Sequence, residues 1–171
     1  MTADSPTAVR SILQKIGLHP SKRLGQNFLC DGNWIRKATK SIPAGWPVVE
    51  IGPGIGALTE VLLRNGHPVH AVEIDSRLCQ FLSDRLAQPR FGLIEADAVS
   101  APLGRFSSGQ IPFAVLSNLP FSITSPWIDS LLHSEGTLPS LLALILQREG
   151  MDRLCAATGT KAYGPTAIRV A

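Results

Sequence analysis

The sequence predicts a doubly wound α/β fold with a mainly parallel sheet. From residue 46 onward, short apolar runs alternate with amphipathic segments. The first of these runs ends in a glycine-rich turn that leads directly into a helical pattern. The 171 residues, 44% of them hydrophobic, are enough to bury one core. Because strands that alternate with helices are joined by right-handed crossovers, we expect parallel strands with helices on both faces.

Two helices are expected before the alternating region. The first covers residues 6–16, because Ser5 is placed to cap it, Pro6 favours a first helical turn and Gly17 favours a helix end. Asp31 is placed to cap a second helix that runs to about Ser41.

The rest of the chain follows in alternation. Strands are predicted for the apolar runs at residues 46–52, 68–75, 90–97, 112–120 and 138–147. Helices are predicted for the amphipathic segments at residues 56–65, 76–87, 125–133 and 148–157. Ligands of such sheets bind beyond the carboxyl ends of the strands, so those ends are the places to look for chemistry.

The first strand ends in VEIGPGIGALT, where Gly52, Gly54 and Gly56 let the backbone turn sharply and lie against a ligand. This GxGxG spacing differs from the GxGxxG of dinucleotide-binding folds, and Pro53 leaves little room for a pyrophosphate. Taken alone, the motif fits a tight strand-to-helix connection without a ligand equally well.

Acidic residues end the second and third strands. Glu73 lies 21 residues beyond Gly52, where a carboxylate can accept hydrogen bonds from both ribose hydroxyls. This position favours a nucleoside-containing cofactor over the alternative of a surface carboxylate. Asp75 is better placed to cap the next helix. Asp97 can accept the amino hydrogens of a cofactor adenine, although an ordinary turn aspartate is the competing interpretation.

The fourth strand closes with SNLPF. Asn118 offers a carbonyl acceptor, Pro120 fixes the direction of neighbouring carbonyls such as that of Leu119, and Phe121 supplies a flat face. An amino group on a planar base needs these partners, and stacking contributes about 1–3 kcal/mol per base. Single-stranded or loop RNA is the cheaper substrate, because extruding a base costs a few kcal/mol. The alternative is a proline turn with Phe121 in the core; the glycine turn and Glu73 at neighbouring strand ends favour the base site.

Seven segments together resemble the ribosomal RNA adenine dimethyltransferases. They are LGQNFL (24–29), VEIGPGIGALTE (49–60), AVEID (71–75), EADA (95–98), SNLPFSITSP (117–126), LQREG (146–150) and KAYG (161–164). The resemblance implies a Rossmann-like S-adenosylmethionine-dependent methyltransferase fold. It also implies N6-dimethylation of adjacent adenosines in small-subunit (16S-type) ribosomal RNA by direct methyl transfer, with that RNA or the small-subunit precursor as partner.

The resemblance further assigns roles to individual residues. Those implied for the cofactor, S-adenosyl-L-methionine, are Gln26, Asn27, Leu29, Gly52, Gly54, Glu73, Asp97 and Asn118. The catalytic residues at the target base are Asn118, Leu119 and Phe121. Most small-subunit enzymes have tyrosine where this chain has Phe121, whereas resistance-type relatives often have phenylalanine there. In contrast, SITSP, the N-terminal segment and KAYG resemble the small-subunit pattern.

The resemblance also predicts the domain organisation. We expect residues 1–45 to form a basic helical segment with a cofactor-capping loop, and residues 46–171 to form the methyltransferase domain. The family normally continues past KAYG through two more strands and a helical C-terminal domain. We therefore expect a truncated chain or an incomplete coding sequence, a fold incomplete at its C-terminus, and a fifth strand at an uncovered sheet edge.

Charge and composition limit the partners. Residues 1–40 have a net charge of +5 and the remainder −2, which fits phosphate contacts but equally a solvated helix face. The odd, widely spaced cysteines Cys30, Cys79 and Cys155 indicate reduced thiols, and no metal site is expected. With no signal peptide or membrane span evident, we expect a cytoplasmic protein, or one in an organelle matrix, that is monomeric and makes no membrane contact.

Four other functions stay open at this point. An NAD-linked oxidoreductase shares the glycines and Glu73, but the GxGxG spacing and SNLPF argue against it. A DNA adenine methyltransferase shares NLPF-like chemistry. A large-subunit ribosomal RNA methyltransferase of the macrolide-resistance type and a non-catalytic RNA-binding or transcription-factor relative are the two alternatives within the fold.

Overall fold

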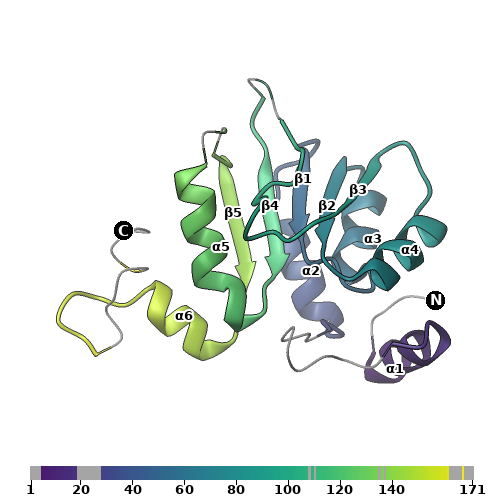
Figure 1. The fold of residues 1–171 in the computed structure, drawn as a ribbon, viewed down its shortest axis with the longest axis horizontal. Helices are drawn as coiled ribbons and strands as arrows, with labels where there is room; N and C mark the ends of the chain where they lie inside the picture. The colour runs from purple at the N-terminus through teal and green to yellow at the C-terminus, as the bar shows by residue number, and fades with distance from the viewer. Residues whose placement is uncertain are drawn as a thin grey trace.

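The computed structural model describes residues 5–18, 28–107, 109, 111–134, 136, 138–161 and 167. Within them the chain forms one parallel sheet in the order β3-β2-β1-β4-β5 (Figure 1). The strands are β1 (Val48–Ile51), β2 (Val69–Glu73), β3 (Phe91–Glu95), β4 (Ala114–Asn118) and β5 (Leu141–Ile145). The helices are α1 (Pro6–Lys15), α2 (Gly32–Lys40), α3 (Ala57–Arg64), α4 (Ser76–Arg85), α5 (Phe121–His133) and α6 (Arg148–Leu154). Every element expected from the sequence is present, and the predicted fold class is confirmed.

The sheet has its topological switch point between β1 and β4. All four residues of β1 are buried and pair in register with β2 on one side and β4 on the other, as in Ile51 with Val72 and Ser117. Strands buried on both faces read as continuous apolar runs, which is why VVEI and AVLS gave a clear signal. The chain leaves β1 and β4 in opposite directions across the sheet, so a crevice opens beyond their carboxyl ends.

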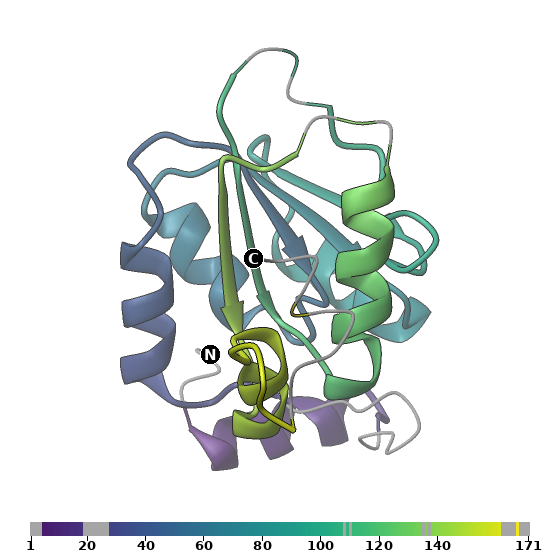
Figure 2. The ribbon, with the colours of Figure 1, turned by 90° about the vertical axis from the view of Figure 1, so that its left-hand side faces the viewer.

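Helices cover both faces of the sheet (Figure 2). On one face, α2, α3 and α4 bury a cluster that includes Ile35, Leu62 and Leu82. On the other face, α5 and the segment after β3 bury a second cluster around Trp127 and Phe113. The two apolar layers hold the five strands in place and fix where their carboxyl ends meet.

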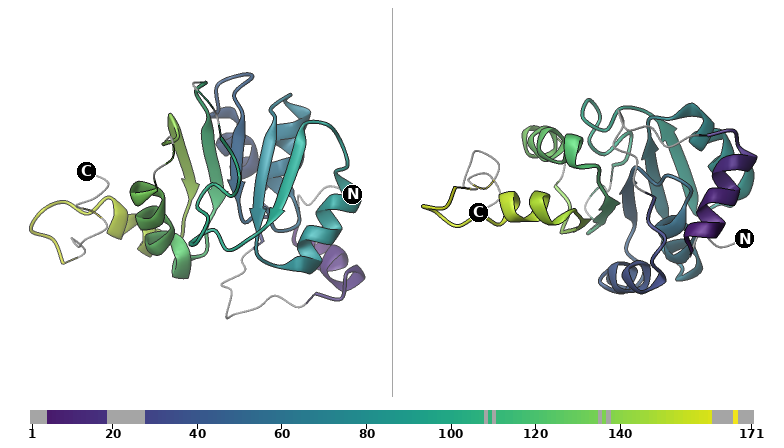
Figure 3. Two further views of the ribbon diagram at one scale, coloured as in Figure 1. Left: turned by 45° about the horizontal axis from the view of Figure 1, so that its top comes forward. Right: turned by 90° about the horizontal axis from the view of Figure 1, so that it is seen from below.

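The first helix closes the carboxyl end of the sheet. Val9, Ile12 and Leu13 of α1 pack against Ile55 of the glycine turn and Leu78 of α4. Seen from below, α1 lies at this end of the molecule, beside α4 (Figure 3). Ser5 caps the helix, accepting a hydrogen bond from the Ala8 amide, as the sequence indicates.

One helix start predicted from the sequence is wrong. α5 begins at Phe121 instead of Ser125, so Pro126 lies inside the helix instead of in its first turn. Pro120 is extended and its carbonyl accepts hydrogen bonds from the Ile123 amide and the Thr124 hydroxyl, which start the helix early. An internal proline removes one helical hydrogen bond. Burial of Trp127, the next residue, offsets that loss.

The last strand lies at a sheet edge, as expected. Among the described residues, β5 pairs only with β4, and Leu142 remains 39% exposed. No helix in the described part of the chain is long and apolar enough to span a membrane.

Candidate functional site

A cavity of about 160 Å³ opens at the carboxyl ends of β1, β2 and β4. Its wall combines the glycine turn, the ends of β2 and β4, and the segment after β3. Leu29 and Phe28 close it from the N-terminal side. The strand ends singled out from the sequence therefore meet at one place.

The glycine turn presents open backbone to this cavity. Gly52 and Gly54 have φ angles of 64° and 58°, in the left-handed region that favours glycine. A Cβ added at Gly52 would meet no atom within 4 Å, whereas one at Gly54 would lie 3.2 Å from the ring of Phe28. Gly52 thus leaves room for a ligand against the main chain, while Gly54 is needed for packing as well as for its conformation.

Glu73 links the end of β2 to the glycine turn. Its Oε2 accepts a hydrogen bond from the Gly54 amide at 3.2 Å. Its Oε1 accepts from the amides of Ile74 and Asp75 at 2.9 and 3.0 Å. Burial raises the pKa of Glu73, and the three amide donors oppose that rise. The carboxyl is thereby held at a fixed position in the cavity wall.

Glu50 is a second buried carboxyl in the same wall, and sequence reasoning did not single it out. It lies in β1, is 1% exposed, and its Oε2 accepts a hydrogen bond of 2.7 Å from the Thr59 hydroxyl. Burial, together with the nearby Glu73, raises the pKa of Glu50 to about 8. The sequence does contain a signal for this site, because Glu50 is the only charged residue in the apolar run VVEI, and glutamate is almost never fully buried unless it is paired.

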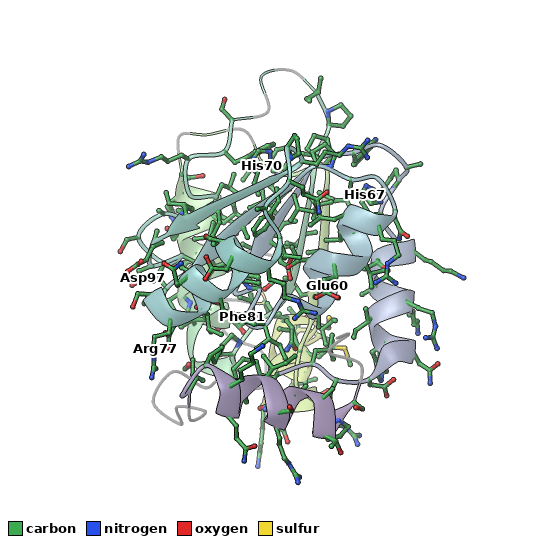
Figure 4. The ribbon with its side chains drawn as sticks, turned by 90° about the vertical axis from the view of Figure 1, so that its right-hand side faces the viewer. Glu60, His67, His70, Arg77, Phe81 and Asp97 are labelled. Carbon is green, nitrogen blue, oxygen red and sulfur yellow. The ribbon has the colours of Figure 1, made fainter. Side chains whose placement is uncertain are left out.

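Asp97 lies at the rim of the cavity. It is exposed, and its Oδ1 accepts a hydrogen bond of 2.9 Å from the Val99 amide, so it also serves as a turn residue. Figure 4 shows Asp97 and Arg77 toward the end of the sheet where α1 packs, with His70 at the opposite end. Asp75 caps α4 as expected, and the Arg77 guanidinium beside it holds the pKa of Asp75 below its usual range.

The SNLPF segment divides between cavity and core. Asn118 lines the cavity at the end of β4, together with Pro120. The side chain of Leu119 instead packs in the core with Trp127, so only its main chain is available to a ligand. Ser117 holds this end of β4 to β1 by donating its hydroxyl to the Ile51 carbonyl.

The structure describes only some of the remaining predicted site residues. Leu29 lines the cavity and packs against the α2–α3 core. Gln26 and Asn27 lie outside the described residues, as does the side chain of Phe121, whose backbone begins α5. No group of three or more His, Cys, Asp or Glu side chains in the described part of the chain could hold a metal ion. What the site offers is hydrogen-bond acceptors, open backbone and apolar walls.

Comparison with known proteins gives a consistent family assignment. Residues 18–171 match the family model described as ribosomal RNA adenine dimethylase. The ribosomal RNA small subunit methyltransferase A of Opitutus terrae is 43% identical over 96% of this chain and 61% of that protein. The same-named protein of Lactiplantibacillus plantarum is 39% identical over 97% of this chain and 58% of that protein. The chain thus spans about 60% of the length of the curated relatives it matches.

Two solved structures share this fold, and in each the match extends over about half of the solved chain. A dimethyladenosine transferase from Plasmodium falciparum matches with a TM-score of 0.69 and 26% identity, over 84% of this chain and 52% of the other. The 23S rRNA methyltransferase ErmE matches with a TM-score of 0.62 and 28% identity, over 78% of this chain and 53% of the other.

Proposed function

Because the chain belongs to the ribosomal RNA adenine dimethylase family, we propose that it is the cofactor-binding part of an S-adenosylmethionine-dependent RNA methyltransferase. The reaction is N6-dimethylation of adjacent adenosines in small-subunit ribosomal RNA. The observation that carries the proposal is the meeting of the glycine turn, Glu73 and Asn118 at one cavity. A dinucleotide cofactor is disfavoured, because Pro53 stiffens the turn where a pyrophosphate would lie.

The cavity residues fit an adenosyl cofactor. Glu73 has about four acceptor positions on its two oxygens, and backbone amides use three of them, which leaves one for a ribose hydroxyl instead of the two expected from the sequence. Asp97 keeps a second carboxylate oxygen for the cofactor adenine besides the one that accepts from Val99. Gly52 admits the ligand against the main chain.

The methionine end of the cofactor is assigned to the N-terminal side of the cavity. Leu29 supports this by lining the wall, and the family resemblance adds Gln26 and Asn27. Residues 1–45 then act as a cap on the methyltransferase domain of residues 46–171, which agrees with the packing of α1 against the glycine turn. When bound, S-adenosylmethionine supplies an electrophilic methyl group carried on a sulfonium.

The target adenine is assigned to the end of β4. Its amino hydrogens are accepted by the side-chain carbonyl of Asn118 and the main-chain carbonyl of Leu119, and Phe121 stacks on the ring. These acceptors hold the amino nitrogen in a fixed orientation, and orientation can supply roughly 7–11 kcal/mol of barrier reduction. The chain's own task is therefore positioning, with no side-chain base required beforehand.

The small-subunit substrate is favoured over the large-subunit alternative by the relatives. Those at 39–43% identity carry the name ribosomal RNA small subunit methyltransferase A, whereas the large-subunit enzyme ErmE is 28% identical. The partner is then ribosomal RNA within the small-subunit precursor. The protein binds it in the cytoplasm, as a monomer.

Calorimetric titration with S-adenosylmethionine tests this assignment. We expect the native chain to bind, Glu73→Ala to weaken binding by removing the ribose acceptor, and Asn118→Ala largely to preserve it. Methyl transfer to small-subunit ribosomal RNA is then measured for the same proteins, and Asn118→Ala should lose transfer while it keeps the cofactor. A folded native chain that does not bind the cofactor would contradict the proposal.

A further inference from the structure

A second hollow lies outside the cofactor cavity, between α2 and α3. The two helices pack side by side on one face of the sheet (Figure 2), and a groove of about 330 Å³ runs between them. Arg36 and Lys40 of α2 line it on one side, and Arg64 and Asn65 at the end of α3 line it on the other. We call this hollow the basic groove.

The basic groove carries an excess of positive charge. Arg36, Lys40 and Arg64 are exposed, and among the described residues none of the three forms an ion pair with a carboxylate. The acid in its wall, Glu60, is paired with Arg85 of α4. Figure 4 shows Glu60 beside the ribbon of α3, and its pairing with Arg85 offsets its negative charge. Three cations therefore line one groove whose single acid, Glu60, is already paired with Arg85.

Helix stabilisation accounts for only part of this arrangement. Lys40 and Arg64 lie in the last turns of their helices, where cations interact favourably with the helix dipole. Arg36 lies in the middle of α2, where that effect is absent. One of its Nη atoms donates to the Asn33 side chain, and the guanidinium has further donors for an anion.

The basic groove adjoins the cofactor cavity at the start of α3. Ala57, the first residue of α3, lines both hollows. From there α3 runs eight residues away from the cavity, about 12 Å at 1.5 Å per residue, which is the axial length of about three stacked nucleotides. A chain of anions that reaches the cavity can thus continue along the basic groove.

We propose that the basic groove binds the phosphodiester backbone of the RNA strand next to the target adenine. This inference rests on the proposed function for its substrate. Phosphate contacts by Arg and Lys position a nucleic acid without reading its sequence, which matches a groove lined by cations rather than by exposed aromatic rings. The role of the groove is to hold the strand while one base occupies the cavity.

Salt-dependent RNA binding tests the proposal. Fluorescence anisotropy with a labelled 20-nucleotide oligouridylate, which contains no target base, measures backbone contacts alone. We expect the double variant Arg36→Gln/Lys40→Gln to bind about tenfold more weakly at low salt. The slope of log affinity against log salt should fall by about 1.4, because two single-strand phosphate contacts are lost.

Two controls separate a site from a general charge effect. Arg90→Gln/Arg105→Gln removes the same charge outside the basic groove and should keep the native slope. Arg36→Lys/Lys40→Arg keeps the charge and should bind almost as tightly as the native chain. Equal weakening by both glutamine doubles would overturn the proposal. So would displacement of the RNA by polyglutamate at equal charge, since the groove would then be a general anion or acidic-protein surface.

Calorimetry with S-adenosylmethionine on the same variants keeps this inference distinct from the proposed function. The groove substitutions should leave cofactor affinity unchanged. If the native chain binds no cofactor but its RNA affinity still depends on Arg36 and Lys40, the proposed reaction fails and the groove stands as an RNA contact. If the cofactor binds but RNA affinity does not depend on Arg36 and Lys40, only the inference about the groove fails, and the proposed function stands.

Discussion

Replacing Glu50 with glutamine is expected to remove a large pH-dependent loss of stability. The carboxyl of Glu50 is 1% exposed, and burial raises its pKa from 4.5 to about 8. The folded chain therefore keeps this proton up to about pH 8, whereas the unfolded chain releases it near pH 4.5. The stabilisation is fully present below about pH 4.5 and is lost as the pH rises through the folded value. The difference between the two pKa values corresponds to roughly 5 kcal/mol.

Urea unfolding from pH 5 to 9, followed by tryptophan fluorescence, to which the buried Trp127 contributes, measures this effect. The quantity of interest is the free energy of unfolding of the native chain minus that of Glu50→Gln at each pH. Glu73, with a raised pKa, and His70, with a lowered one, titrate in both proteins and largely cancel in the difference. The difference should fall steadily from pH 5 to 8 and then level off. Parallel curves for the two proteins would refute the reasoning.

A second substitution tests the cause of the same titration. The Thr59 hydroxyl donates to Glu50 and lowers its pKa, so Thr59→Val should raise that pKa further. The pH at which the stability curve levels off should then move upward. An unchanged levelling point would mean that Thr59 does not control the ionisation of Glu50.

Three further substitutions have effects that follow from local geometry. Gly54→Ala forces a left-handed conformation on alanine and crowds Phe28, so urea unfolding should show a loss of about 1–2 kcal/mol, and calorimetry a loss of cofactor affinity. Trp127→Phe removes the indole donor to the Pro102 carbonyl at 3.0 Å; the expected cost is about 1–3 kcal/mol by circular dichroism, and no loss would contradict that hydrogen bond. Asp31→Ala removes the cap that accepts two amides of α2 and should cost about 1 kcal/mol in the same assay, with Asp31→Asn close to native.

The order and type of the elements could be predicted from the sequence because their causes are local. Caps such as Ser5 and Asp31, and apolar runs of strand length, act through neighbouring residues, and the structure has them where they were expected. The start of α5 was misplaced because Pro126 also favours a first turn, whereas Pro120 and Thr124 begin the helix four residues earlier.

The candidate site could be predicted as a set of strand ends but not as a geometry. Parallel strands bring their carboxyl ends to one edge, so the glycine turn, Glu73 and Asn118 had to be neighbours once the fold class was known. Leu119 shows the limit of this reasoning, because only the structure decides that its side chain packs in the core with Trp127.

The sequence by itself determined the fold class, the glycine turn and the family, since these depend on residue types at short spacings. Only the tertiary structure decided the ionisation of Glu50 and the formation of the basic groove. A carboxyl pKa depends on how much water the surrounding layers exclude, and that exclusion comes from segments distant in the chain. Likewise, Arg36 and Arg64 line one groove only because α2 and α3 pack against the same face of the sheet.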